Sequence, residues 1–233
     1  MVPARSVGGE ARRAPLDRDQ VVAAAVALAD EKGVAGVTMR AVAGRLGVEA
    51  MSLYNHVRHR DDLLDGMVDA VFAEIELPAA EVEWREAMRR RADSARQALR
   101  HHPWAVGLLD SRSAPGPATL RHHDAVLGVL RTGGFSVAGA ARAFSVIDSY
   151  LYGFVLQEVS LPFRSSEELG EVAGGILDGL DAERYPHLVE ITTQHALQPG
   201  YDYADEFDAG LALILDALRP DDRHPPGGAS DTH

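Results

Sequence analysis

Side chains able to bind nucleic acid are concentrated between Thr38 and Arg60. This stretch reads TMRAVAGRLGVEAMSLYNHVRHR and combines arginine, serine, tyrosine, asparagine and histidine over a short distance. Arginine can pair with guanine, asparagine can pair with adenine, and basic side chains neutralise phosphates. These residue types predict a surface that reads double-stranded DNA.

The spacing of apolar residues in this stretch predicts a helix, a glycine turn and a second, short helix. Thr38 can cap the first helix by accepting a backbone N–H two or three residues on. Gly47 is expected to end that helix, because glycine takes the left-handed conformation without steric cost. The apolar face between them holds Met39, Val42 and Leu46.

The second helix is expected to begin near Glu49 or Ala50. Leu53 and Val57, four residues apart, would then point into the core. The remaining side chains would face outward as candidate base readers: Ala50, Met51, Ser52, Tyr54, Asn55 and His56.

An ordinary helical hairpin in an all-α core would show the same local pattern, so the neighbouring segments matter. Residues 17–32 predict an amphipathic helix that ends at Gly33. A longer helix is predicted from Arg60 to Ile75, with Asp61 and Asp62 in its first turn, where the helix dipole favours negative charge. The chain therefore begins with three short helices followed by a fourth, connecting helix.

This arrangement resembles the N-terminal domain of the TetR family of one-component transcriptional regulators. The phrase SLYNHVRHRDDLLD is especially similar to the tetracycline-repressor branch. The matching residues are Gly33, Thr38, Arg40, Val42, Ala43, Leu46, Gly47, Val48, Leu53, Tyr54, His56, Val57, Leu63 and Leu64.

The resemblance implies roles for individual side chains. Arg40 matches an arginine that reads a base edge, and Arg60 matches a phosphate-binding lysine. Tyr54 and His56 match positions that contact the backbone or bases, and Ser52 matches a threonine. Three positions depart from the branch, where glutamine, proline and tryptophan stand in place of Ala50, Met51 and Asn55. A different operator is therefore expected, in which Asn55 can itself pair with adenine. The full set of predicted DNA-binding residues is Thr38, Arg40, Ala50, Met51, Ser52, Tyr54, Asn55, His56 and Arg60.

DNA phosphates bind basic side chains, so a negatively charged chain seems unsuited to DNA binding unless its acidic residues lie elsewhere. The net charge is −12, yet residues 1–65 hold nine basic and nine acidic side chains, so the acidic excess lies beyond them. Arg5, Arg12 and Arg13 lie in a Pro- and Gly-containing arm, which either contacts phosphates and the minor groove or is a solvated tail.

Several other functions lack their sequence signals. There is no cysteine, hence no disulfide or thiolate metal site, and no apolar run reaches the roughly 20 residues of a membrane span. HExxH, GxSxG and P-loop motifs are also missing. We therefore predict a cytoplasmic protein that is not an enzyme and has no cofactor and no metal site.

The remainder of the chain is predicted to be helical. The longest pattern, residues 137–160, carries two apolar stripes, and the last helix carries a stripe that includes Leu211 and Leu215. This excess of apolar helix surface indicates that a partner molecule covers part of it. In addition, residues 84–218 resemble a C-terminal domain of the same family that dimerises through a four-helix bundle. We therefore expect a homodimer to which Leu211 and Leu215 contribute. The predicted helices are 82–102, 119–131, 137–160, 167–180, 185–197 and 205–219.

A small-molecule effector is expected to bind among these helices, since ligand sites in bundles are mostly apolar with a few placed polar groups. Each candidate is also a plausible core residue. The candidates are Trp104, Leu108, Leu109, His123, Phe144, Ile147, Tyr150, Leu151, Phe154, Gln157 and Glu158.

The resemblance makes one further point about the effector. Leu109 stands where the tetracycline repressor has its magnesium-binding histidine, and Gln157 stands where it has a nearby acid. A magnesium–tetracycline complex would lose its anchor, so an unknown, more lipophilic effector is expected. We interpret His101, His102, His122 and His123 as solvated side chains on helix surfaces.

Together these observations predict an all-α protein in which a three-helix DNA-binding domain is joined by a connecting helix to a ligand-binding and dimerisation domain. The predicted function is a homodimeric repressor that a small molecule releases from a palindromic operator. The alternative is a DNA-binding architectural or interaction module without a ligand. The predicted segments are a disordered basic arm (1–16), the helix-turn-helix domain (17–65), the effector-binding domain (66–219) and a disordered tail (220–233).

Overall fold

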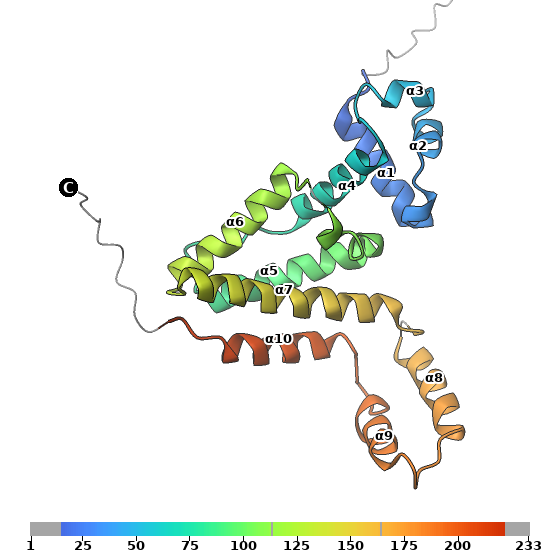
Figure 1. The fold of residues 1–233 in the computed structure, drawn as a ribbon. Coiled ribbons are helices and arrows are strands. Elements are labelled where there is room, and N and C mark those ends of the chain that lie inside the picture. The colour runs from blue at the N-terminus through green and yellow to red at the C-terminus, as the bar shows by residue number, and fades with distance from the viewer. Residues whose placement is uncertain (1–14, 113, 164, 222–233) are drawn as a thin grey trace, which may run out of the picture. The chain divides into compact units, whose positions relative to one another are not determined.

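All regular elements in the described residues are helical, as predicted (Figure 1). The structure is a computed structural model that describes residues 15–112, 114–163 and 165–221. Arg5, Arg12 and Arg13 therefore lie outside the described residues. The α-helices are α1 (Arg18–Lys32), α2 (Met39–Leu46), α3 (Ala50–Leu53), α4 (Arg60–Glu74), α5 (Trp84–His101), α6 (Pro117–Thr132), α7 (Val137–Ser160), α8 (Ser166–Asp178), α9 (Pro186–Ile191) and α10 (Asp205–Ala217). Short 3-10 turns cover Val34–Gly36, Pro103–Ala105 and Leu109–Ser111.

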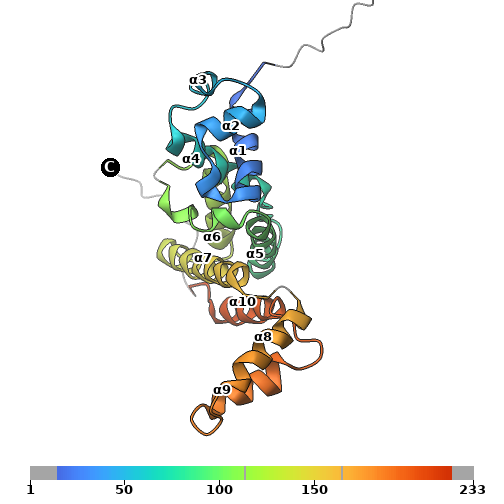
Figure 2. The same ribbon diagram turned by 90° about the vertical axis from the view of Figure 1, so that its right-hand side faces the viewer.

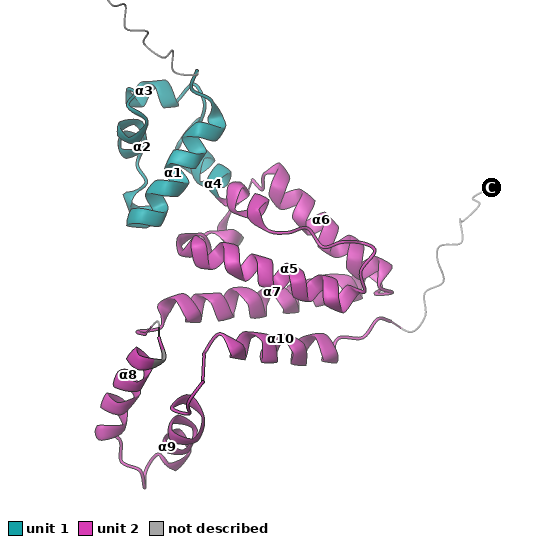
Figure 3. Cartoon of the chain, turned by 180° about the vertical axis from the view of Figure 1, so that it is seen from behind, with its two compact units in different colours: residues 1–67 teal, residues 68–233 magenta. Residues whose placement is uncertain are grey.

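The chain divides into two compact units between Met67 and Val68, so α4 contributes residues to both (Figure 3). The first unit holds α1, α2, α3 and the beginning of α4. Its helices enclose an aliphatic core, and burying each such side chain contributes about 1.5–3 kcal/mol. The largest members of this core are Val21, Val22, Leu28, Val37, Val42, Leu53, Val57, Leu63, Leu64 and Met67.

The helix-turn-helix has the predicted local geometry. Thr38 caps α2, because its Oγ1 accepts a hydrogen bond of 3.1 Å from the backbone N–H of Ala41. Gly47 ends α2 in the left-handed conformation, with φ 68° and ψ 35°. Leu53 and Val57 are buried as predicted. The second helix is shorter than predicted, because α3 ends at Leu53 and Val57 lies beyond the turn that follows it.

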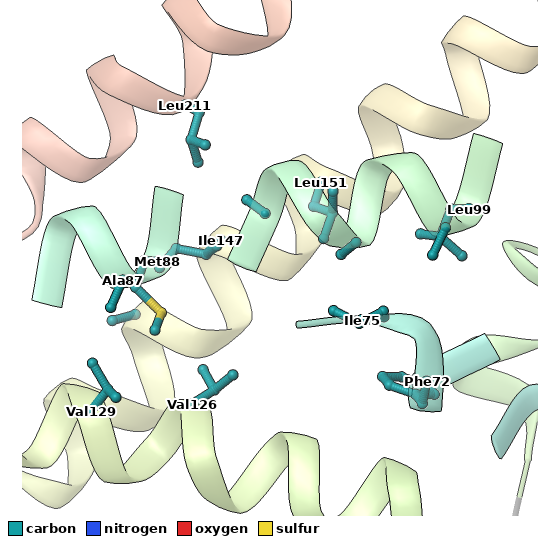
Figure 4. Close-up of a cluster of buried hydrophobic side chains, with 14 of the residues drawn as sticks. Phe72, Ile75, Ala87, Met88, Leu99, Val126, Val129, Ile147, Leu151 and Leu211 are labelled. Carbon is teal, nitrogen blue, oxygen red and sulfur yellow. The ribbon is translucent and has the colours of Figure 1, made fainter. Parts of the chain in front are cut away.

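The second unit is built around α5, α6, α7 and α10. Figure 4 shows Ala87 and Met88 of α5 close to Val126 and Val129 of α6, with Ile147 of α7 beside them. The same core extends to Phe72 and Ile75 near the end of α4. The amphipathic pattern of each helix therefore accounts for the side that it buries.

The positions of two leucines on α10 differ from the expected dimer contact. Leu211 and Leu215 are buried within their own chain, with Leu211 only 1% exposed, so the prediction that they contact a partner is wrong. Both belong to the core that α7 shares with α10. The exposed large apolar side chains of these two helices are instead Val137, Val146 and Leu156 on α7 and Leu213 on α10.

Helices α8 and α9 lie beyond the ends of α7 and α10 in two perpendicular views (Figures 1 and 2). The single helix expected at residues 185–197 is divided, because α9 passes into a π-helix at Thr192–Ala196. There the hydroxyls of Thr192 and Thr193 donate to backbone carbonyls one turn earlier. Among the described helices, none is both long and apolar enough to cross a membrane.

Candidate nucleic-acid interface and ligand cavity

The predicted base readers lie together on α2, α3 and the turn that follows α3. Met51, Tyr54 and Asn55 are exposed, whereas Ala50, Ser52 and His56 are half-buried. Arg40 is exposed on α2. Among the described residues it has no hydrogen-bond or ion-pair partner, so its guanidinium is available to a ligand.

Arg60, the predicted phosphate contact, also forms hydrogen bonds within its own unit. Its Nε donates to the carbonyl oxygen of Val37 and its Nη2 donates to that of Val34, both at 3.2 Å. These bonds tie the first residue of α4 to the segment between α1 and α2. The side chain nevertheless remains exposed. Its removal is therefore expected to affect both local order and phosphate binding.

An ion pair that the sequence analysis missed fixes the turn after α3. Asp62, which is buried, accepts hydrogen bonds from Arg18 at 2.9 and 3.2 Å and from the backbone N–H of Arg58 at 2.8 Å. Arg18 also donates to the carbonyl oxygen of His56 at 3.1 Å. The hydrogen bond from Arg18 holds the pKa of Asp62 well below its usual range. The Arg18–Asp62 pair therefore connects α1 with α4 and, through Arg18, with the backbone of His56, a predicted DNA-contacting residue.

Because of the Asp62 carboxylate, we expect the stability of the first unit to fall in acid. Because the folded state lowers the pKa of Asp62, its stabilisation is complete above the unfolded value of about 4 and is lost as pH falls through the folded value. Asp62→Asn should make opening of α1–α4 easier by about 1–3 kcal/mol at neutral pH, and less so in acid. Hydrogen exchange of peptides from α1–α4 between pH 3 and 7 measures this difference. Asp61→Asn, an exposed change in the same helical turn, is the control, and an equal effect of the two variants would contradict the prediction.

The second unit contains two described cavities. The larger, of about 780 Å³, lies at the C-terminal ends of α5 and α7 and extends to residues 201–204. The smaller, of about 440 Å³, has α4, α6, α7 and the turn at Leu109 in its wall. The wall of the smaller cavity consists of Phe72, Leu109, His123, Phe144, Ser145, Asp148, Ser149 and Tyr152.

The predicted ligand-binding residues are divided among different environments. Leu109, His123 and Phe144 line the smaller cavity. Glu158 lines the larger one, where its carboxylate is held by Arg96 at 2.6 Å.

The other predicted liners belong to neither of these two cavities. Gln157 is exposed and accepts a hydrogen bond of 3.1 Å from the Tyr203 hydroxyl. Tyr150 donates to the carbonyl oxygens of residues 206 and 207, which ties α7 to α10. The remaining candidates pack in or against the core, with Ile147, Leu151 and Phe154 buried and Trp104 and Leu108 partly buried.

Two histidines differ from the interpretation as solvated surface residues. His102 is buried, and its Nε2 lies 3.1 Å from Glu74. His122 is fully buried because it shares the inner face of α6 with Thr119 and Val126. Burial and the nearby Arg91 lower the pKa of His122 to about 3, so its imidazole is neutral.

Behind the smaller cavity lies a polar group of residues, here called the Arg91 cluster: Arg91, His122, Asp148 and Tyr152. The Arg91 guanidinium is buried, pairs with Asp148, and donates from Nε to His122 Nε2 at 2.9 Å. The Tyr152 hydroxyl donates to Asp148 Oδ2 at 3.2 Å. One sequence feature could have indicated this cluster. Arg91 lies on the apolar stripe of α5 that includes Met88 and Ala95, and a charged residue in such a stripe is expected to be buried with a partner.

A carboxylate from α4 caps α6. Asp69 Oδ1 accepts hydrogen bonds from the backbone N–H of Thr119 at 2.8 Å and from its hydroxyl at 2.9 Å. Asp69 Oδ2 accepts from the backbone N–H of Ala118 at 3.2 Å. A negative charge is favourable at a helix N-terminus. Gly116 permits the contact, because a Cβ there would lie 2.3 Å from the Asp69 carboxyl carbon.

Comparisons with known proteins agree with this architecture. Residues 21–67 match the profile of bacterial regulatory proteins of the tetR family, and residues 77–220 match that of the tetracycline repressor-like C-terminal domain. An HTH-type transcriptional regulator of Saccharopolyspora erythraea is 38% identical, over 86% of this chain and 83% of its own length. The class A tetracycline repressor protein of Escherichia coli is 33% identical, over 87% of this chain and 90% of its own.

A solved structure shows the same fold. ActR of Streptomyces coelicolor in complex with actinorhodin superposes with a TM-score of 0.75 at 29% identity, covering 88% of this chain and 96% of ActR. The two profile matches extend over both units of this chain and confirm the resemblance to the TetR family that was noted for the helix-turn-helix residues and for residues 84–218. The chain therefore belongs to the TetR family and is a DNA-binding transcription regulator, not an enzyme.

Proposed function

We propose that this regulator is a homodimeric repressor that a small-molecule effector releases from a palindromic operator. The observation that carries the proposal is the presence, in one chain, of exposed side chains at the predicted reading positions and of a cavity whose wall includes α6. An architectural module would not need such a cavity. Two similar proteins support the proposal, since one is named as the repressor DrrR1 of Streptomyces coeruleorubidus and ActR was solved with actinorhodin.

On the DNA side, Arg40 is assigned to a base edge and Arg60 to phosphate. Arg40 has the unpaired guanidinium that bidentate recognition of guanine requires. Tyr54, Asn55 and Met51 supply the exposed surface beside it. Arg60 stands at the start of α4, where its hydrogen bonds to the carbonyl oxygens of Val34 and Val37 position its charge.

These roles predict different effects of two substitutions. Arg40→Ala should weaken operator binding by about 1–3 kcal/mol and relax the preference for the operator over random DNA. Arg60→Ala should weaken binding to all sequences and reduce the slope of log affinity against log salt by about one. Fluorescence anisotropy at several salt concentrations measures both. Arg45→Ala, which removes a side chain paired with Glu31 at 2.7 Å, is the control. Equal losses on operator and random DNA would refute the division of roles.

Dimerisation is assigned to the exposed apolar side chains of α7 and α10. Val146, Leu156 and Leu213 face away from the core of their own chain, and a second copy would cover them. Two copies related by a twofold axis can place their reading helices about 34–36 Å apart, one turn of DNA, which matches a palindrome.

Effector release is assigned to the link between α6 and α4. The wall of the smaller cavity includes His123 of α6, and the N-terminus of α6 is held by Asp69 of α4. Helix α4 is continuous with the residues of the first unit. A ligand releases DNA only if it binds the DNA-incompetent conformation more tightly, and a coupling of about 1–3 kcal/mol lowers DNA affinity roughly 5- to 150-fold.

The effector assignment is tested by titrating the operator complex. Release is expected with members of a panel of lipophilic compounds in the absence of magnesium, since Leu109 and Gln157 do not supply the ligands that a magnesium–tetracycline complex uses in the tetracycline repressor. Electrophoretic mobility or anisotropy reports the release. Release by tetracycline with magnesium, and by no compound of the panel, would refute it.

A further inference from the structure

Residues 54–58, here called the reading turn, carry three predicted DNA contacts on a segment that its own backbone holds weakly. Helix α3 before it ends at Leu53 and is one turn long, and helices this short are marginal without tertiary contacts. The backbone N–H groups of Tyr54 and Asn55 reach carbonyl oxygens of α3 at 3.3 and 3.4 Å, which are long hydrogen bonds. The geometry of the reading turn therefore depends on contacts from other parts of the first unit.

Two buried side chains, Leu53 and Val57, attach the reading turn to the core. Apolar contacts have no preferred direction, so they keep the turn close to the core but leave its backbone free to rotate about these two side chains. Hydrogen bonds to the peptide groups beside Val57 can prevent this rotation, because hydrogen bonds require particular distances and angles.

Arg18 and Asp62 supply these hydrogen bonds. Arg18, the first residue of α1, donates from Nη1 to the carbonyl oxygen of His56 at 3.1 Å. Asp62 Oδ2 accepts from the backbone N–H of Arg58 at 2.8 Å. The carbonyl and the N–H belong to the two peptide bonds of Val57. The ion pair therefore holds the reading turn on both sides of its buried residue.

The guanidinium of Arg18 makes contacts that a simple positive charge could not make. Its Nη1 also donates to Asp62 Oδ2 at 3.2 Å, and its Nη2 donates to Asp62 Oδ1 at 2.9 Å and to the backbone carbonyl oxygen of Asp62 at 3.2 Å. A lysine would carry the same charge on one nitrogen and lack this planar fork. The first turn of α1 is itself fixed, because Asp17 and Gln20 form a capping box.

Arg40, the predicted base reader on α2, offers an internal comparison. The ends of α2 are set by Thr38 and Gly47. The hydrogen bonds of Arg18 described above lead to the reading turn and to α4, and not to α2. A change at Arg18 should thus move the reading turn and leave Arg40 in place.

We propose that Arg18 is a positioning residue for operator recognition, which reads no base itself but fixes the orientation of the reading turn together with Asp62. This inference rests on the proposed function, in which Asn55 belongs to the DNA-reading surface. Base preferences that come from the reading turn then depend on a side chain of α1, whereas those that come from Arg40 do not.

Arg18→Lys tests the proposal, because it keeps the charge and removes the fork. Affinity for operator DNA selected with the wild-type protein should fall roughly 5- to 30-fold, as expected for the loss of one or two hydrogen bonds. Affinity for random DNA and the salt slope should not change. Arg45→Lys is the matched control, since Arg45 pairs with Glu31 of α1 at 2.7 Å and its side chain is 37% exposed, against 43% for Arg18. Fluorescence anisotropy on the full-length protein, corrected for the active fraction by stoichiometric titration, measures these affinities.

Base preferences separate positioning from a general loss of stability. A set of operators with single base-pair changes shows which base pairs each variant no longer distinguishes. Arg18→Lys should relax the same base pairs as Asn55→Ala and combine with it less than additively, but should combine additively with Arg40→Ala. Asp62→Asn releases the same turn from its other partner and should give the same pattern, so it replaces Arg18→Lys if that variant does not fold.

The outcomes distinguish this proposal from the function on which it rests. Wild-type behaviour of Arg18→Lys would show that only the charge of Arg18 matters and would overturn the positioning role. Equal weakening on operator and random DNA, or additivity with Asn55→Ala, would indicate a general structural defect and would also overturn it. Both results leave the reading surface intact as an assignment. If Asn55→Ala itself alters no base preference, the assignment of base reading to this turn fails, and this proposal fails with it.

Discussion

Glutamate at both Val146 and Leu213 is expected to convert the protein into a folded monomer with operator affinity reduced roughly 10²- to 10⁴-fold. Val146 is 41% exposed and Leu213 is 75% exposed, so neither charge disturbs the core of its own chain. In a dimer both would be buried against apolar side chains, where an unpaired carboxylate is strongly unfavourable. The loss in affinity is large because the second half-site is then no longer bound within the same complex.

Sedimentation velocity measures the oligomeric state, circular dichroism reports the fold, and anisotropy on operator DNA selected with the wild-type protein reports binding. Leu120→Glu is the control, since Leu120 is 55% exposed and lies on α6, outside the two helices to which the interface is assigned. Leu211→Glu should instead lower stability, because Leu211 is buried in the monomer. A folded double variant that still sediments as a dimer would disprove the assignment of the dimer interface.

Arg91→Met is expected to lower the stability of the second unit by about 3–5 kcal/mol. Methionine matches much of the volume of the arginine side chain, but the change leaves the buried Asp148 carboxylate without its counter-charge. Adding Asp148→Leu should restore most of the loss, because a buried ion pair can be replaced by apolar residues of similar volume at little net effect. The double variant should thus be more stable than Arg91→Met alone.

Chemical denaturation followed by tryptophan fluorescence measures these changes, since Trp84 and Trp104 both lie in the second unit. Arg89→Met on the exposed face of the same helix is the control and should change stability by less than about 1 kcal/mol. A double variant no more stable than Arg91→Met would show that the packing of the arginine, and not its charge, is what α5 requires.

The sequence was sufficient where local chemistry decides the structure. Thr38 and Gly47 act within one helical turn, so the two ends of α2 could be predicted from residue types alone. Helix α7 has the predicted bounds, because the serine before it caps its first turn and 24 residues follow without an interruption by proline. The grouping of the predicted reading residues could be expected for the same reason, since α2, α3 and the turns beside α3 are adjacent in sequence.

The sequence was insufficient where segments far apart meet. Periodicity showed that α7 has two apolar stripes and α10 has one, but it could not show which stripe packs within the chain and which is left for a partner. The Arg18–Asp62 and Arg91–Asp148 pairs join different helices. His122 was misjudged for the same reason, since its burial depends on α5, which supplies Arg91.

The cap on α6 has a consequence for how this protein changes over generations. A Cβ at position 116 would lie 2.3 Å from the Asp69 carboxyl carbon, so a larger residue there requires that carboxylate to move away from the N-terminus of α6. A substitution at Gly116 is therefore expected to loosen the cap, and the same substitution should cost less once a smaller side chain has replaced Asp69. The effect of a change at either position thus depends on the residue at the other.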